Sequence, residues 1–303
     1  MKKLNWGIIG VGWIAHEMAD ALNQVNGEIY AATAPTAAHL AKFAAEKHVL
    51  HTYTNADTML NDPNVDVVYI ATPHTFHYEY IKKALLAGKH VFCEKAITVN
   101  AHQFDEVAAL ARKKNLILSE GFTLYHMPIY KQVKDLINAG KLGEIHMIQV
   151  NFGSLKDYDV NNRFFSKELA GGALLDIGGY ATAFARYFMD EQPNAVQTMV
   201  KFFETGVDEQ SGIIMKNTRE QMAVMALSMR AKQPKRGSSA HGETHTTLTA
   251  GVSADALVYE VQDMQRYIEQ GHDDGELALS HDVAHLLDSV RTAWGMRYPF
   301  DNK

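Results

Sequence analysis

The chain has 303 residues, 47% of them hydrophobic and 21% charged, which is an ordinary globular balance with room for two domains. Its 29 lysines and arginines stand against 35 acidic residues, so the formal net charge is −6. This mildly acidic balance gives no electrostatic reason to expect nucleic acid or an anionic membrane as a partner. The single cysteine, Cys93, excludes an intrachain disulfide framework and favours a reducing, cytoplasmic location.

The first apolar run is too short for a targeting or membrane segment. It is interrupted by Gly7, Gly10 and Gly12 and followed by His16 and Glu17, so we expect no signal peptide. Elsewhere the sequence has no stretch close to the roughly 18 apolar residues that a membrane-spanning helix needs.

Short apolar runs alternate with helical patterns over the first 120 residues. The runs predict strands and read LNWGIIG, EIYAATA, VDVVYIAT, HVFCEK and NLILSEGF. The patterns predict helices over 14–25, 37–47, 76–87 and 101–114. Strand and helix alternating at this spacing indicate an α/β Rossmann domain, a parallel sheet with helices on both faces. In such sheets ligands bind at the carboxyl ends of the strands.

The first strand runs into a G-x-G-x-x-A motif formed by Gly10, Gly12 and Ala15. The first glycine permits the tight turn, the second lets a pyrophosphate approach the backbone, and the alanine permits close helix packing. Trp13 and Ile14 lie between them, where the helix opens. The strand-to-helix context predicts that all five residues bind a dinucleotide.

The end of the second strand usually decides between NAD and NADP. An acid there binds the ribose 2′-hydroxyl, whereas an arginine favours the 2′-phosphate. This chain has neither and offers Thr33, Thr36 and His39 as polar candidates. The missing acid favours NADP, although these residues could equally open a surface helix.

Glu94 and Lys95 form a charged pair directly after the buried-looking run His90 to Cys93. Burying one such charge alone is costly. Their position at the carboxyl end of a strand indicates a functional role.

The sequence changes character from about residue 144. EIHMIQVNFGS, AVQTMVKFF, GIIMKN, QMAVMALSMR and THTTLTAGV predict longer strands with few helices between them, hence an α+β domain with a mainly antiparallel sheet. One helical pattern covers 173–189 and contains Gly178 and Gly179, which suggests that something approaches this helix closely. Asp176 and Tyr180 are four residues apart on it and share a face. The segment ALSHDVAHLLDSVRTAW predicts a last helix.

These motifs together resemble the Gfo/Idh/MocA family of NAD(P)-dependent oxidoreductases over nearly the whole chain. They are the G-x-G-x-x-A strand, YIATPHTFHYEYIKKALLAGKHVFCEKAIT, GGALLDIGGY and the closing WGMRYPF. The resemblance implies a Rossmann domain over 1–121 and an open-faced sheet domain over 122–303 that binds substrate, forms the oligomer and returns its last helix to the first domain.

The resemblance also assigns the catalytic residues. Glu94 and Lys95 match the family's E-K-P signature, with Ala96 in place of the proline. Asp176 matches the family aspartate, and Tyr180 stands where a histidine is usual. A tyrosine there is typical of the branch that contains dihydrodiol dehydrogenase and glucose–fructose oxidoreductase.

The implied reaction moves a hydride between nicotinamide and a hydroxyl or carbonyl of a sugar-like or cyclic diol. Lys95 and Tyr180 would form the acid–base pair, because a nearby ammonium favours the phenolate, and Asp176 would orient Lys95 or bind a second hydroxyl. The resemblance adds Thr72, Pro73, His77, Glu94 and Lys95 to the cofactor site. It adds Tyr125, Asn161 and Arg163 to the substrate site, where each could also be an ordinary surface residue.

Several alternatives stay open. The chain could be a cofactor-binding sensor without turnover, because fold alone does not fix function. We expect a homodimer or higher homo-oligomer, with apolar surface provided by Val150, Phe152, Met199, Phe203, Met225 and Met229. The pairs His241/His245 and His281/His285 have zinc-like spacing but no evident third ligand, so no metal is expected. The basic run 230–237 is interpreted as an exposed connection.

Overall fold

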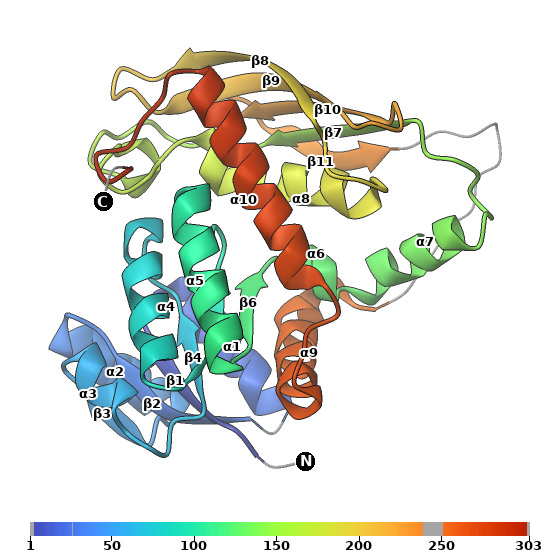
Figure 1. Cartoon of the computed structure of the whole chain (residues 1–303). Helices are drawn as coiled ribbons and strands as arrows, with labels where there is room; N and C mark the ends of the chain where they lie inside the picture. The colour runs from blue at the N-terminus through green and yellow to red at the C-terminus, as the bar shows by residue number, and fades with distance from the viewer. Residues whose placement is uncertain (1–2, 26, 239–250, 302–303) are drawn as a thin grey trace. The chain divides into compact units, whose positions relative to one another are not determined.

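The computed structural model describes residues 3–25, 27–238 and 251–301 and divides into two compact units (Figure 1). The Rossmann unit comprises Met1–Thr98, His102–Met127 and Gly251–Leu277. The sheet unit comprises Val99–Ala101, Pro128–Ala250 and Ala278–Lys303. The first unit thus continues past the expected boundary at residue 121 and takes in a later segment of the chain.

The Rossmann unit is built on a six-stranded parallel sheet. Its strands, in spatial order, are β3 (His51–Tyr53), β2 (Glu28–Thr33), β1 (Asn5–Ile9), β4 (Val67–Ile70), β5 (His90–Glu94) and β6 (Leu118–Gly121). The strand order reverses between β1 and β4, and ligands of such sheets bind at the carboxyl ends of the strands next to this reversal.

Helices pack on both faces of this sheet. They are α1 (Trp13–Gln24), α2 (Ala37–Lys47), α3 (Ala56–Leu60), α4 (His77–Leu86), α5 (Ala101–Lys114), α6 (Thr123–His126) and α9 (Ala256–Gln270). One hydrophobic core cluster joins α1, α2 and α9 to the strands through buried side chains such as Met18, Phe43, Phe92 and Tyr267. The bounds of α2 and α5 are those predicted from the sequence, whereas α9 was not predicted.

The sheet unit contains a five-stranded mixed sheet. Its strands, in spatial order, are β11 (Gln233–Ser238), β7 (Met147–Gly153), β10 (Met222–Ser228), β9 (Asp208–Lys216) and β8 (Ala195–Phe202). Only β7 and β10 pair in parallel, and the other pairs are antiparallel. The expected fold class, an α/β Rossmann domain followed by a mainly antiparallel α+β domain, is confirmed.

Of two predictions about this sheet, one is contradicted and the other falls almost entirely outside the described residues. The interpretation of 230–237 as an exposed connection is wrong, because β11 pairs with β7 there. A strand's backbone pairing does not depend on apolar side chains, so a basic, proline-containing run can still form one at the sheet edge. The strand predicted over 244–252, like His241 and His245, lies almost entirely outside the described residues.

Helices of the sheet unit are α7 (Pro128–Asn138), α8 (Gly179–Phe188) and α10 (Glu276–Ala293), which begins two residues before the unit boundary. A π-helical turn, Leu174–Gly178, precedes α8, and together they form what we call the site helix. Figure 1 shows α8 along one face of the sheet, and the buried sulfur of Met225 contacts Thr182 of this helix at 4.0 Å.

Most of the residues that were expected to form apolar surface on this sheet do not do so. Four of them are buried instead, namely Val150, Phe203, Met225 and Met229. The exposed apolar side chains of the strands include Met147 on β7, Met199 on β8 and Ile214 on β9. Alternation has period two, so it predicts that one set is buried but not which one. Among the described residues, no helix combines the length and apolar character that crossing a membrane requires.

Candidate active site

The turn after β1 holds two glycines in different surroundings. Gly10 has φ +91°, and a Cβ there would lie 2.7 Å from the carbonyl oxygen of Ala71, so only glycine fits. Gly12 has an ordinary φ of −74°, and a Cβ there would meet nothing within 4 Å. The fold therefore requires Gly10, whereas the space beside Gly12 is left open at the start of α1.

A pocket of about 260 Å³ adjoins this turn. Three predicted cofactor residues line it, namely Gly10, Thr33 and Thr72, from the ends of β1, β2 and β4. Thr36 and His39 are exposed near the start of α2 and are not among its lining residues. Of the other predicted cofactor residues, Trp13 is exposed, Ile14 and Pro73 are half-buried, and Ala15 is buried.

The pocket also contains residues that the sequence analysis missed. Asn55 and Asp57 reach it from the start of α3, and Tyr80 and Lys83 from α4. Lys83 Nζ lies 2.9 Å from Asp57 Oδ1. The spacing of Tyr80 and Lys83 behind His77, three residues apart on one helix face, was the available signal.

The Rossmann unit anchors Glu94 at the end of β5. The buried hydroxyl of Tyr69, on neighbouring β4, donates a hydrogen bond to Glu94 Oε1. Burial raises the pKa of Glu94, and the Tyr69 hydrogen bond and the Lys95 charge oppose this. The carboxyl group is thus tied to the sheet, while Lys95 beside it is half-buried.

The turn after Lys95 is held by two buried side chains. The Lys95–Ala96 peptide bond is cis. His77 places Nδ1 2.9 Å from the carbonyl oxygen of Ala96 and Nε2 2.7 Å from that of Thr72. Glu120 Oε1 accepts a hydrogen bond from the N–H of Ile97 at 2.8 Å. His77 therefore connects the loop after β4 to the Lys95 turn, a role in addition to the cofactor contact expected for it.

In the sheet unit, the site helix carries Asp176 and Tyr180. Asp176 is buried, and its Oδ1 lies 3.8 Å from a guanidinium nitrogen of Arg163. Tyr180 is half-buried, and its ring centroid lies 6.2 Å from that of Phe152 on β7. The structure thus places Arg163 beside Asp176, which lies on a π-helical turn of the kind often found at functional sites, and Tyr180 follows four residues later in α8.

Gly178, one of the two glycines for which a close approach was predicted, does meet a close neighbour. A Cβ on Gly178 would lie 2.8 Å from Leu227 Cδ1 of β10. A side chain at this position would push the site helix away from the sheet.

Two other predicted substrate residues are Tyr125, in the Rossmann unit, and Asn161, in the sheet unit. Tyr125 of α6 is buried, with its ring centroid 5.5 Å from that of Phe122. Asn161 is exposed in a turn, where its backbone and side-chain N–H groups both donate to Asp159 Oδ1.

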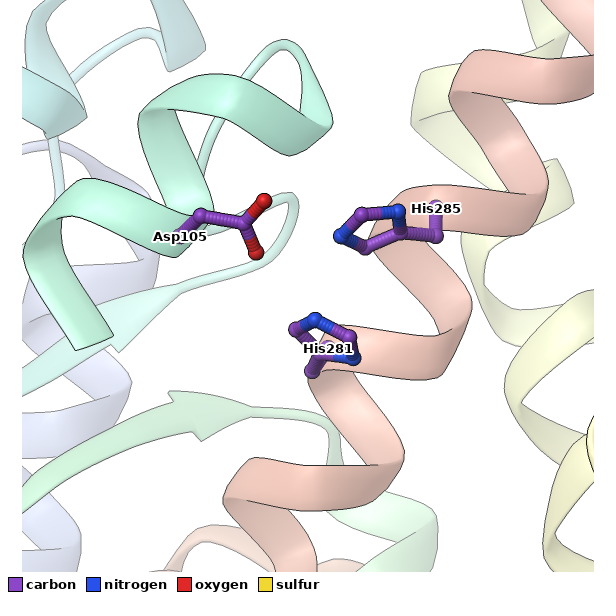
Figure 2. A group of neighbouring side chains, drawn as sticks. All are labelled: Asp105, His281 and His285. Atoms are coloured by element: carbon purple, nitrogen blue, oxygen red, sulfur yellow. The ribbon is translucent and has the colours of Figure 1, made fainter. Parts of the chain in front are cut away.

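His281 and His285 project from the same side of α10, as Figure 2 shows, and their ring centroids are 4.2 Å apart. Asp105, also drawn there, belongs to the Rossmann unit. Two imidazoles supply half of the ligands of a tetrahedral zinc site.

Residues of the Rossmann unit fit a nicotinamide dinucleotide. The open space at Gly12 lies where backbone N–H groups of the α1 N-terminus can receive a pyrophosphate, and the adjoining pocket begins at the end of β2, where an adenosine ribose is bound in such folds. The nicotinamide would then extend toward the ends of β4 and β5, where Thr72 and Lys95 lie.

Comparisons with known proteins agree with this geometry. Residues 4–122 match the model of the oxidoreductase family with an NAD-binding Rossmann fold, and residues 130–249 match the GFO/IDH/MocA C-terminal domain. The trans-1,2-dihydrobenzene-1,2-diol dehydrogenase of Xenopus tropicalis is 29% identical over 97% of this chain and 99% of its own. That of Xenopus laevis is 33% identical over 76% of this chain and 70% of its own.

Solved structures show the same fold. A 3-ketoreductase from Actinomadura kijaniata, in complex with NADP and TDP-benzene, has a TM-score of 0.85 at 23% identity and covers 96% of this chain and 98% of its own. A levoglucosan dehydrogenase, in complex with NADH and levoglucosan, has a TM-score of 0.84 at 19% identity over 97% and 98%. The relatives support an enzyme rather than a sensor. The chain belongs to the Gfo/Idh/MocA family of NAD(P)-dependent oxidoreductases and acts as a dehydrogenase or reductase on CH–OH groups.

Proposed function

We propose that this enzyme oxidises a sugar-like or cyclic diol with NADP, using Lys95 and Tyr180 as its proton-handling pair and Asp176 as a substrate ligand. The observation that carries the proposal is the site helix, where a buried aspartate and a half-buried tyrosine share one turn. Full-length similarity to dihydrodiol dehydrogenases supports the substrate class.

The reaction requires two transfers from one carbinol group. A bound nicotinamide would supply the hydride acceptor, and a protein base would take the hydroxyl proton, so that the carbinol would become a carbonyl. A tyrosine has a reference pKa of about 10, and a neighbouring ammonium favours its phenolate. Tyr180 therefore accepts the proton, and Lys95 stabilises the developing negative charge on the substrate oxygen.

Charge and hydrogen bonding assign the supporting roles. Glu94 holds the end of β5 through Tyr69, so that Lys95 leaves the strand from a fixed point. Arg163 lies 3.8 Å from Asp176, whose side chain can accept a hydrogen bond from a second hydroxyl of a diol.

NADP is proposed over NAD because the end of β2 carries no acidic residue. No acid stands at Thr33 to Thr36 to receive a ribose 2′-hydroxyl or to repel a 2′-phosphate. Solved structures of similar fold were determined with NADP or with NADH, so the preference must be measured for this chain.

A cytoplasmic homodimer is proposed as the working form. The single cysteine fits a reducing compartment. The exposed side chains of Met147, Met199 and Ile214, the second of them 82% exposed, supply apolar surface on the sheet that a second copy would cover. Sedimentation should show a dimer that Met199→Glu dissociates, and a wild-type monomer at micromolar concentration would contradict this.

The test is a panel of cyclic diols, aldoses and polyols, including trans-1,2-dihydrobenzene-1,2-diol, followed by NADPH and NADH absorbance. We expect turnover with a diol or sugar, at a higher kcat/KM with NADP than with NAD, and loss of it in Tyr180→Phe. The proposal fails if no diol or sugar is oxidised and no corresponding carbonyl is reduced while NADPH still binds.

A further inference from the structure

A buried carboxyl group that the sequence analysis did not single out holds the start of the site helix. Asp208, the first residue of β9, is 0% exposed, and its Oδ2 accepts a hydrogen bond from the N–H of Leu174 at 2.7 Å. The N–H groups of Ala173 and of Asp208 itself also bond to this carboxyl. A strand residue thus caps a helix end whose first N–H groups would otherwise have no partner.

Gly172 makes the room that this carboxyl occupies. Its φ is +113°, and a Cβ there would lie 2.1 Å from Asp208 Oδ1. That oxygen has no hydrogen-bond partner among the described residues. A proton on Oδ1 would leave Oδ2 free to cap the helix and would remove the buried charge.

The C-terminal segment approaches the same turn from another direction. The buried hydroxyl of Tyr298 donates a hydrogen bond to the carbonyl oxygen of Gly171 at 2.7 Å. Burial raises the pKa of Tyr298 well above its usual value, and the Asp208 charge raises it further. Arg291 lies 4.9 Å from the Tyr298 ring centroid and bonds to Asp301.

The next residue of β9, Glu209, forms ion pairs with two other residues. Its Oε1 lies 3.0 Å from Lys201 Nζ and 3.8 Å from the guanidinium of Arg230. Tyr298 is a titratable neighbour of Asp208, since the Asp208 charge raises the pKa of its phenol, and Arg291 and Asp301 also act on that phenol.

We propose that Asp208 is a positioning residue for the site helix, which it holds at Leu174 so that Asp176 and Tyr180 leave the helix in fixed directions. The inference rests on the proposed function, which gives those two side chains their roles. Asp208 acts through the helix backbone and contacts neither reactant.

The cap is sensitive to pH near neutrality. Burial raises the pKa of Asp208 from 3.8 to about 7 in the folded chain. Because the folded-state pKa is the higher one, the group's stabilising contribution is complete below pH 3.8 and is lost as the pH rises to about 7. Raising the pH through this window therefore favours opening of the turn.

The test uses two variants and one matched control. Asp208→Asn keeps an acceptor oxygen but cannot ionise, and Asp208→Ala removes the cap. Asp135→Asn makes the same chemical change at an exposed position of α7. Hydrogen–deuterium exchange of peptides covering 170–180 is measured between pH 5 and pH 8 and corrected for the intrinsic pH dependence of amide exchange.

Opening of the wild-type turn should increase by about 10- to 100-fold over this range, because each pKa unit corresponds to a factor of ten. Asp208→Asn should show no such increase, and Asp135→Asn should follow the wild type. Asp208→Ala should open about five- to thirtyfold more than Asp208→Asn at pH 5, the scale of a lost helix cap. With a turnover substrate, Asp208→Ala should lower kcat without changing KM for NADPH, and Asp208→Asn should restore kcat.

Equal pH dependence in wild type and Asp208→Asn would overturn the proposal, as would an Asp208→Ala turn no more open than that of Asp208→Asn. If Asp208→Ala does not fold, the pH dependence of exchange in the wild type and in Asp208→Asn still tests the proposal. A chain that binds NADPH but turns over no diol or sugar contradicts the proposed function while the exchange result stands, so the two failures are distinguishable.

Discussion

Gly12 of the Rossmann unit and two glycines of the sheet unit, Gly172 and Gly178, have opposite surroundings. Beside Gly12 of the Rossmann unit, a Cβ would have nothing within 4 Å. In the sheet unit, a Cβ on Gly172 would lie 2.1 Å from a carboxyl oxygen, and one on Gly178 would lie 2.8 Å from a leucine methyl group. The first glycine leaves open space at the start of α1, where we propose that the cofactor binds, whereas the other two make room for the protein's own side chains.

The largest effect on stability is expected at Gly172, where a Cβ would overlap the Asp208 carboxyl group. Gly172→Ala should lower the free energy of unfolding by about 3 kcal/mol, since backbone strain and overlap each cost about 1–3 kcal/mol. Chemical denaturation measures this loss. Gly212→Ala is the control, because a Cβ on that glycine of β9 would meet nothing within 4 Å. Equal free energies of unfolding for the two variants would contradict the claim that the space around each glycine decides the effect of a Cβ.

At Gly12 the loss should appear in binding and not in stability. Gly12→Asp places a negative charge against the pyrophosphate, so the affinity for NADPH should fall by about 100-fold or more, in line with the several kcal/mol that juxtaposed like charges cost. Fluorescence titration with NADPH measures the affinity, and Gly12→Ala should lose less. Unchanged NADPH binding by Gly12→Asp would move the cofactor site elsewhere.

A smaller effect is expected at Gly178. Alanine favours a helix interior by about 1 kcal/mol relative to glycine, but the overlap with Leu227 costs about 1–3 kcal/mol. Gly178→Ala should therefore be destabilising by at most about 2 kcal/mol on its own. In a Leu227→Val background the overlap is relieved, and the same change should become neutral or stabilising. Denaturation of the four proteins checks this, and a Gly178 effect that is independent of residue 227 would rule out the contact as its cause.

Much of the Rossmann unit was predictable because its signals are local. Helices 37–47 and 101–114 follow from apolar periodicity, and the G-x-G-x-x-A turn lies directly after a strand. The omission of α9 also has a local reason, since its buried Glu260 and Asp263 interrupt the apolar stripe of the helix.

The sheet unit was less predictable because its decisive contacts are distant in sequence. Asp208 caps a helix 34 residues before it, and no motif around Asp208 signals this partner. A distant contact of the same kind was also missed in the Rossmann unit, where Asp57 and Lys83 line one pocket from two helices. The residues of the candidate site could be proposed from the sequence. Their hydrogen-bond partners could be identified only from the structure, because they are distant in the sequence.

The central claim is that Lys95 and Tyr180 act as one proton-handling unit, and a double-mutant cycle of kcat/KM tests it most directly. Lys95→Met and Tyr180→Phe should each reduce activity by about 100-fold, the scale of a positioned acid–base group. The double variant should then be little worse than the poorer single variant, because each change disables the same unit. Losses that multiply to about 10⁴-fold, or full activity in Tyr180→Phe, would contradict the account.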